Sequence, residues 1–164
     1  MVNKILKEKM RGKIAIVGIG NTIRGDDGAG PELIERLGKT QLTTHDKQLL
    51  LIDAGEVPEN YLSKIVEFNP ETILLIDAVD FNESPGKIKL VEQDEIINTG
   101  FSTHNSSLVL VINYLRNEIE ADILFLGIQP KGTALMAGLS EPVEASVSEI
   151  EDAILECWNN GIME

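Results

Sequence analysis

The sequence predicts an α/β fold in which helices cover both faces of a twisted, mostly parallel sheet, so that the chain forms three layers (α/β/α). Short apolar segments recur at a regular spacing along the chain, and amphipathic segments lie between them. This alternation is typical of strands that are buried on both faces and joined by helical crossovers. One interval, at Ser84-Pro-Gly86, is too short for a helix, so we expect one strand to run antiparallel.

Four segments have the composition of buried parallel strands, because they are short, continuous and rich in branched apolar residues. They are residues 13–19, 49–52, 73–76 and 123–128. The second and third run directly into an aspartate, Asp53 and Asp77 respectively. Ile88 and Leu90 alternate with polar neighbours instead, which indicates a strand with one wet face at an edge of the sheet.

Four amphipathic segments predict helices, and proline or glycine marks several of their ends. They extend from Pro31 to Gly38, from Pro58 to the residues before Pro70, from Ser106 to Ile119 and from Pro142 to Trp158. We treat residues 1–164 as one domain, because no linker, repeat or low-complexity stretch interrupts the pattern. Residues 1–12 precede the first strand and are expected to form an extra N-terminal helix or a tail.

Composition excludes several classes of function. The net charge is −13, so nucleic acid and anionic membranes would repel the chain. Cys157 is the only cysteine, which excludes an internal disulfide and any cysteine-rich zinc or iron–sulfur site. No apolar run approaches the ~20 residues of a membrane span, and the N-terminus lacks the apolar core of a secretory signal. We expect a cytoplasmic protein that binds neither nucleic acid nor membrane.

A glycine-rich segment joins the first predicted strand to the first helix, which is the position of a dinucleotide-binding loop. Gly18 and Gly20 match that pattern, but Ile23 occupies the place of the third glycine. Asp26 and Asp27 lie where a pyrophosphate would need N–H donors rather than negative charge. The glycines therefore favour a loop with unusual backbone dihedrals that presents carboxylates.

Two further polar residues lie where open α/β sheets place their chemistry, outside the carboxyl ends of the strands. Asp77 ends a very apolar strand, so its carboxylate must be solvated, hydrogen-bonded or bound to a cation, unless it caps a loop or helix. His104 precedes the third helix, where a capping or exposed histidine is the ordinary alternative. Together with a carboxylate of the glycine-rich loop they form an oxygen and nitrogen set that suits Ni, Zn, Mn or Fe and leaves positions open for water or substrate.

Six pieces of the sequence, in this order and spacing, resemble the hydrogenase maturation proteases, which process the large subunit of [NiFe] hydrogenases. The resemblance extends from about Ile14 to Trp158. Its pieces are Gly18-Ile-Gly-Asn21, Gly25-Asp-Asp-Gly28, Asp53-Ala-Gly-Glu-Val-Pro-Glu-Asn60, Leu75-Ile-Asp-Ala78, Thr103-His-Asn105 and Phe125-Leu-Gly-Ile-Gln-Pro130. Within these pieces, Pro58-Glu-Asn60 and Gly127-Ile-Gln-Pro130 are most similar to the subgroup that serves hydrogenase 3 of the formate hydrogenlyase type.

The resemblance implies a five-stranded, mostly parallel sheet with one antiparallel strand. It also implies an aspartic-type endopeptidase that removes the C-terminal extension of the large-subunit precursor after nickel insertion. Nickel carried by that precursor is the implied recognition element, and Asp27, Asp77 and His104 are the implied metal-binding and catalytic residues. Either carboxylate could act as the base, and a divalent metal in the resting site is a further expectation. We expect the enzyme to be a monomer.

Three other functions stay open from the sequence. The same ligands would suit a nickel carrier that does not cut, and a nucleotide-binding protein or another peptidase of this fold are the remaining alternatives. Asp26 is expected either to orient Asp27 or to close the loop. Asn21 and Gln129 are candidates for hydrogen bonds to the substrate backbone.

Overall fold

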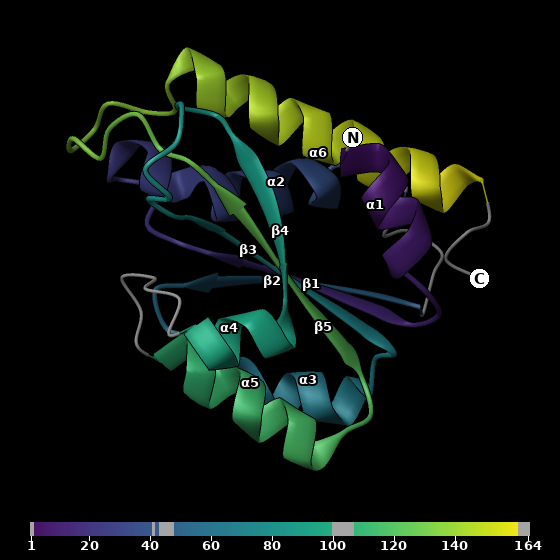
Figure 1. Ribbon diagram of the computed structural model, residues 1–164. Helices are drawn as coiled ribbons and strands as arrows, with labels where there is room; N and C mark the ends of the chain where they lie inside the picture. The colour runs from purple at the N-terminus through teal and green to yellow at the C-terminus, as the bar shows by residue number, and fades with distance from the viewer. Residues whose placement is uncertain (1, 41, 43–47, 100–106, 161–164) are drawn as a thin grey trace.

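The computed structural model describes residues 2–40, 42, 48–99 and 107–160, which include a five-stranded sheet of order β2-β1-β3-β5-β4 (Figure 1). The strands are β1 (Ile14–Ile19), β2 (Leu49–Gly55), β3 (Thr72–Ala78), β4 (Ile88–Glu92) and β5 (Asp122–Ile128). Neighbouring strands pair in parallel, except that β4 lies antiparallel to β5 at the edge. The predicted fold class and the antiparallel edge strand are confirmed.

Helices cover both faces of the sheet (Figure 1). One layer holds α1 (Val2–Lys9), α2 (Ala29–Gly38) and α6 (Glu141–Asn159), and the other holds α3 (Leu62–Phe68), α4 (Gln93–Thr99) and α5 (Ser107–Glu118). Side chains along each strand alternate between these layers. In β1, for example, Ile14 and Ile16 belong to the core beneath α2 and α6, whereas Ala15 and Val17 belong to the other core.

Several helix ends differ from those predicted. A short 3-10 turn over Gly25–Gly28 precedes α2, and a second one begins at Pro58, so that the α-helix there begins only at Leu62. The extra N-terminal helix is present as α1. Helix α4 was not predicted, because Ile96 and Ile97 are too few apolar residues to establish a helical period.

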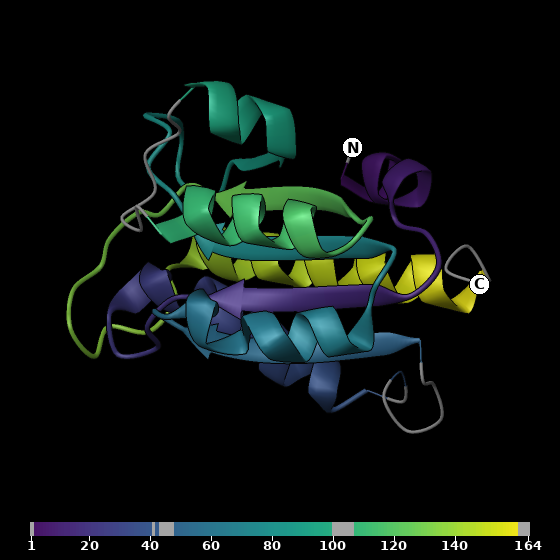
Figure 2. The ribbon, with the colours of Figure 1, turned by 90° about the horizontal axis from the view of Figure 1, so that it is seen from below.

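The loops that follow β1 and β5 lie at the same end of the sheet, where both arrows point in Figure 2. This is the edge at which parallel strands present their carboxyl ends, and it is where the sequence predicts the site. Among the described residues, no helix is both long and apolar enough to cross a membrane.

Candidate active site

Asp27 lies in the 3-10 turn after β1, and tightly packed backbone determines its position. The Asn21 N–H donates to the carbonyl of Asp27 at 3.0 Å, and the Asp27 N–H donates to the carbonyl of Arg24 at 3.1 Å. Gly20 has φ +144°, and a Cβ there would lie 1.9 Å from the Asp27 carbonyl oxygen. A side chain at residue 20 would therefore push the turn away from the strand. The glycine-rich segment thus positions an acidic turn, as the sequence predicts.

Asp26, the neighbouring acid, is fully buried and serves a structural role. Its carboxylate accepts hydrogen bonds from the N–H groups of Lys131, Gly132 and Ser140 at 2.8, 3.1 and 2.7 Å, and from the Ser140 hydroxyl at 2.8 Å. Burial acts to raise the pKa of Asp26, but these four donors outweigh it and hold the pKa below its ordinary value. Of the two roles expected for Asp26, the structure shows that it closes the loop, by fastening residues 131–140 to the turn that carries Asp27.

Asp77 is the penultimate residue of β3, a strand in which every residue is buried, and only 7% of its surface is exposed. Its Oδ1 accepts no hydrogen bond from any described residue. Burial raises the pKa of Asp77 to about 8, the negative charges of Asp27 and Glu56 add to this effect, and the Ala78 N–H partly offsets it. Asp77 is therefore predominantly protonated at neutral pH in the free protein.

Asp27 and Asp77 line one pocket of about 310 Å³, so the structure brings together two of the three predicted site residues. Arg24, Glu56 and Thr133 also line this pocket, which we call the acidic pocket. His104 lies outside the described residues. No three histidine, cysteine, aspartate or glutamate side chains form a metal-binding group within the described part of the chain, so the third ligand stays a prediction.

Arg24, Glu56 and Thr133 were not predicted as site residues, although Glu56 lies within the family-like segment Asp53–Asn60. Glu56 follows β2, whose carboxyl end is adjacent to that of β1, so the strand-end rule could have identified it. Thr133 lies outside the motifs, three residues after the last of them, and the hydrogen bonds that Asp26 accepts from its loop bring it to the pocket. That contact joins residues more than 100 positions apart through backbone N–H groups, which leave no pattern in a sequence.

Gln129 does not face a substrate, contrary to one prediction. Its Oε1 accepts hydrogen bonds from the N–H groups of Phe81 and Glu83 at 2.6 and 3.3 Å, and its Nε2 donates to Asp80 at 3.1 Å. These contacts occupy both ends of the buried amide, so Gln129 orders the connection between β3 and β4. Cys157 is buried, and burial raises the pKa of its thiol, so it lacks the properties of a nucleophile.

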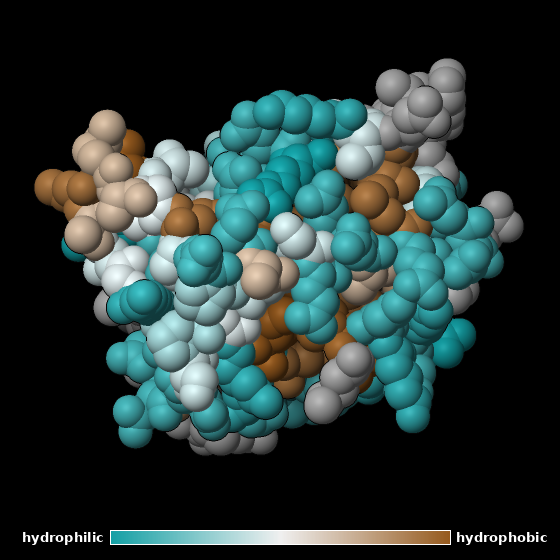
Figure 3. Space-filling model, turned by 90° about the horizontal axis from the view of Figure 1, so that it is seen from above, coloured by the Kyte–Doolittle hydropathy of each residue, from teal (hydrophilic) through white to brown (hydrophobic). Residues whose placement is uncertain are grey.

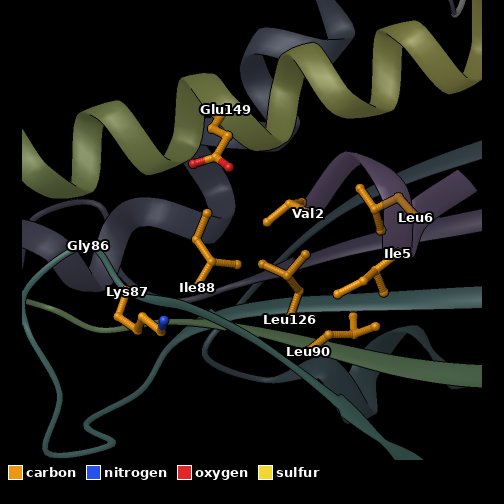
Figure 4. Close-up of a pocket in the computed structure, with 9 residues that line it drawn as sticks. All are labelled: Val2, Ile5, Leu6, Gly86, Lys87, Ile88, Leu90, Leu126 and Glu149. Atoms are coloured by element: carbon orange, nitrogen blue, oxygen red, sulfur yellow. The ribbon is translucent and has the colours of Figure 1, made fainter.

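A second hollow of about 260 Å³ lies between α1, α6 and the edge strand β4 (Figure 4). Apolar side chains such as Ile5, Ile88 and Leu90 form most of its wall, and Lys87 and Glu149 are the charged residues that line it. This apolar groove lacks the paired acids that could activate water. The acidic pocket is therefore the candidate active site.

Comparison with known proteins agrees with this site. Residues 31–157 match the hydrogenase maturation protease family. The chain is 33% identical over 141 residues to the hydrogenase 3 maturation protease of Escherichia coli, covering 85% of this chain and 86% of that one. Its structure resembles a [NiFe] hydrogenase maturation protease from Thermococcus kodakarensis with a TM-score of 0.81 at 31% identity, covering 94% and 96% of the two chains. A hydrogenase maturating endopeptidase of E. coli shares the fold at 21% identity, with a TM-score of 0.73 over 93% and 94% of the chains. The chain belongs to the hydrogenase maturation protease family.

Proposed function

We propose that this chain is the endopeptidase that removes a C-terminal extension from the precursor of a [NiFe] hydrogenase large subunit once that precursor carries nickel. Family membership supports the peptidase activity and the class of substrate. One structural observation supports nickel recognition. Asp77, whose buried Oδ1 has no hydrogen-bond partner among the described residues, lines the same pocket as Asp27, and these are the two positions where the family motifs place metal-binding acids.

The chemistry of the pocket fits a divalent cation carried by the substrate. A buried carboxyl oxygen without a hydrogen-bond partner is costly unless a cation or proton satisfies it. Asp27 and Asp77 would supply two oxygen ligands, and His104 would supply a nitrogen ligand, a mixture that suits a metal of borderline hardness such as nickel. A cation beside Asp77 would displace its proton, because the positive charge favours the ionised form.

Binding of the metal would hold the precursor in one orientation against the enzyme, so that the scissile peptide bond lies beside the pocket. Such positioning lowers the activation barrier by several kcal/mol, and by about 7–11 kcal/mol in the best-oriented reactions. Hydrolysis then adds the hydroxyl of water to the carbonyl carbon, breaks the C–N bond and delivers a proton to the departing amine. A carboxylate in this pocket can accept a proton from water, and either Asp27 or Asp77 could take that role.

The test is cleavage of the purified precursor with and without nickel, followed by mass spectrometry. The proposal predicts loss of the tail from the nickel-loaded precursor only, and loss of cleavage in each of Asp27→Asn, Asp77→Asn and His104→Ala. Unchanged cleavage by any of the three variants would refute the assignment of that residue. Cleavage that is indifferent to nickel would refute recognition of the metal.

A nickel carrier that uses the same ligands would bind the loaded precursor and leave its mass unchanged, so the same assay separates the two functions. Nucleotide binding is disfavoured because the acidic side chains of Asp27 and Glu56 line the pocket and would repel phosphates. A monomeric state, a cytoplasmic location and the choice of hydrogenase 3 as target stay predictions from the sequence.

A further inference from the structure

Exposed apolar side chains lie close in the sequence to residues that line the acidic pocket. Leu135 and Met136 are 69% and 83% exposed, and they lie just after the pocket residue Thr133. Ile23, which is also largely exposed, directly precedes the pocket residue Arg24. Figure 3 shows hydrophobic side chains gathered on the loop that projects at the left of that view, which is the 131–140 loop of Figure 1.

The same arrangement recurs on a third loop. Val57 is exposed and directly follows the pocket residue Glu56, in the connection after β2. Each of three loops thus supplies at least one polar residue to the pocket and carries at least one exposed apolar residue within three positions of it. We call Ile23, Val57, Leu135 and Met136 the apolar rim.

Hydrogen bonds hold the most exposed part of the rim in place. The Met136 N–H donates to the Ile23 carbonyl at 2.8 Å, and the Asp26 N–H donates to the Gly132 carbonyl at 2.9 Å. Met136 has φ +61°, a left-handed backbone conformation that residues other than glycine rarely adopt. The chain therefore maintains an unfavourable backbone conformation and an exposed methionine on the loop that contributes Thr133 to its candidate active site. Exposed apolar groups that gather in one patch mark interaction sites, whereas single scattered ones are normal.

We propose that the apolar rim is the surface on which the folded hydrogenase precursor docks, through an apolar patch that surrounds its nickel site. This inference rests on the proposed function, because it takes the acidic pocket as the place where the substrate's metal binds. A partner whose metal enters the pocket must cover the loops that border it, and those loops carry the rim. A second copy of this chain on the same surface would block the pocket, so self-association there is incompatible with catalysis.

The test compares steady-state cleavage of the nickel-loaded precursor by wild type and by a Leu135→Ser/Met136→Ser double variant. The matched control is Leu110→Ser, because Leu110 on α5 is 70% exposed but contributes nothing to the acidic pocket. Removal of two exposed contact residues is expected to raise KM about tenfold or more with little change in kcat. The control is expected to keep both constants, and all three proteins should bind Ni²⁺ alone equally well by calorimetry.

The possible failures are distinguishable. If the wild type does not cleave the loaded precursor, the proposed function is wrong. If the wild type cleaves and the double variant keeps its KM, the rim is not the docking surface although the function stands. A loss of kcat or of Ni²⁺ binding in the double variant would show that the loop shapes the pocket rather than docking the substrate. Concentration-dependent dimers of the wild type that the double variant lacks would assign the rim to self-association and would also overturn the inference.

Discussion

Asp77→Asn is expected to make the metal-free protein more stable, although it removes a residue of the candidate active site. The carboxyl of Asp77 has its pKa raised from 3.8 to about 8. An acid with a raised folded-state pKa takes up a proton on folding, so its stability contribution is most favourable at low pH and is lost as the pH rises toward 8. At about 1.4 kcal/mol per pH unit, the cost near pH 7 is roughly 4 kcal/mol.

Asparagine keeps the shape of Asp77 and an acceptor for the Ala78 N–H, but it does not titrate. Burial of its amide without full hydrogen bonding costs about 1–3 kcal/mol, which reduces the net gain in the free energy of unfolding. The change of the stability difference with pH is therefore the diagnostic quantity. The stability difference between variant and wild type should widen by about 2 kcal/mol between pH 6 and pH 8 and level off above that.

The assay is urea unfolding at several pH values in the presence of a chelator, with the free energy of unfolding compared at each pH. Two stability curves that stay parallel from pH 6 to pH 9 would refute the argument, because they would show that Asp77 ionises normally in the folded protein. A variant less stable than wild type by the same amount at every pH would show that its effect comes from packing alone.

Three further predictions follow from the geometry of the site. The stability of the Asp27→Asn variant should level off at a lower pH than that of the wild type, because the Asp27 charge helps to raise the pKa of Asp77. If urea unfolding shows both proteins levelling off at the same pH, that coupling is excluded. Asp26→Asn should lower the free energy of unfolding by about 3–5 kcal/mol at neutral pH, because three N–H groups and a hydroxyl lose a buried anion as acceptor. Denaturant unfolding measures this loss, and a value below about 1 kcal/mol would contradict the anchoring role. Gly30→Ala should destabilise the protein by about 2–3 kcal/mol, because the new Cβ would lie 2.5 and 2.6 Å from the carbonyl oxygens of Ile19 and Ile76. Gly38→Ala is the control, since a Cβ there meets nothing within 4 Å. Equal melting temperatures for the two variants would refute the steric argument.

The sheet and the pair of acids could be predicted because both follow from local patterns and a general rule. Continuous apolar strands indicate parallel pairing, and β1 and β3 are neighbours whose carboxyl ends meet, so the residues that follow them converge. Asp77 was identifiable because a carboxylate at the end of an apolar strand needs a partner. Its unpartnered oxygen and its raised pKa depend on packing that no sequence pattern specifies.

The rest of the site depends on contacts between distant segments. Asp26 and Asp27 are adjacent and chemically identical, yet one is a buried anchor and the other lines the pocket. Only the position of the 131–140 loop separates their roles, and that loop has neither periodicity nor a motif. The resemblance to the family placed the metal-binding role on Asp27, which the residues alone left open.

We propose that Asp27 and Asp77 act together in a pocket that recognises a metal on a protein substrate and directs its cleavage. The most direct measurement is the mass of a purified hydrogenase large-subunit precursor after incubation with the enzyme, with the precursor either loaded with nickel or free of it. We expect loss of the C-terminal extension from the loaded precursor alone, and no loss with Asp77→Asn at matched folding. Removal of the extension from nickel-free precursor, or by Asp77→Asn at the wild-type rate, would contradict the proposal.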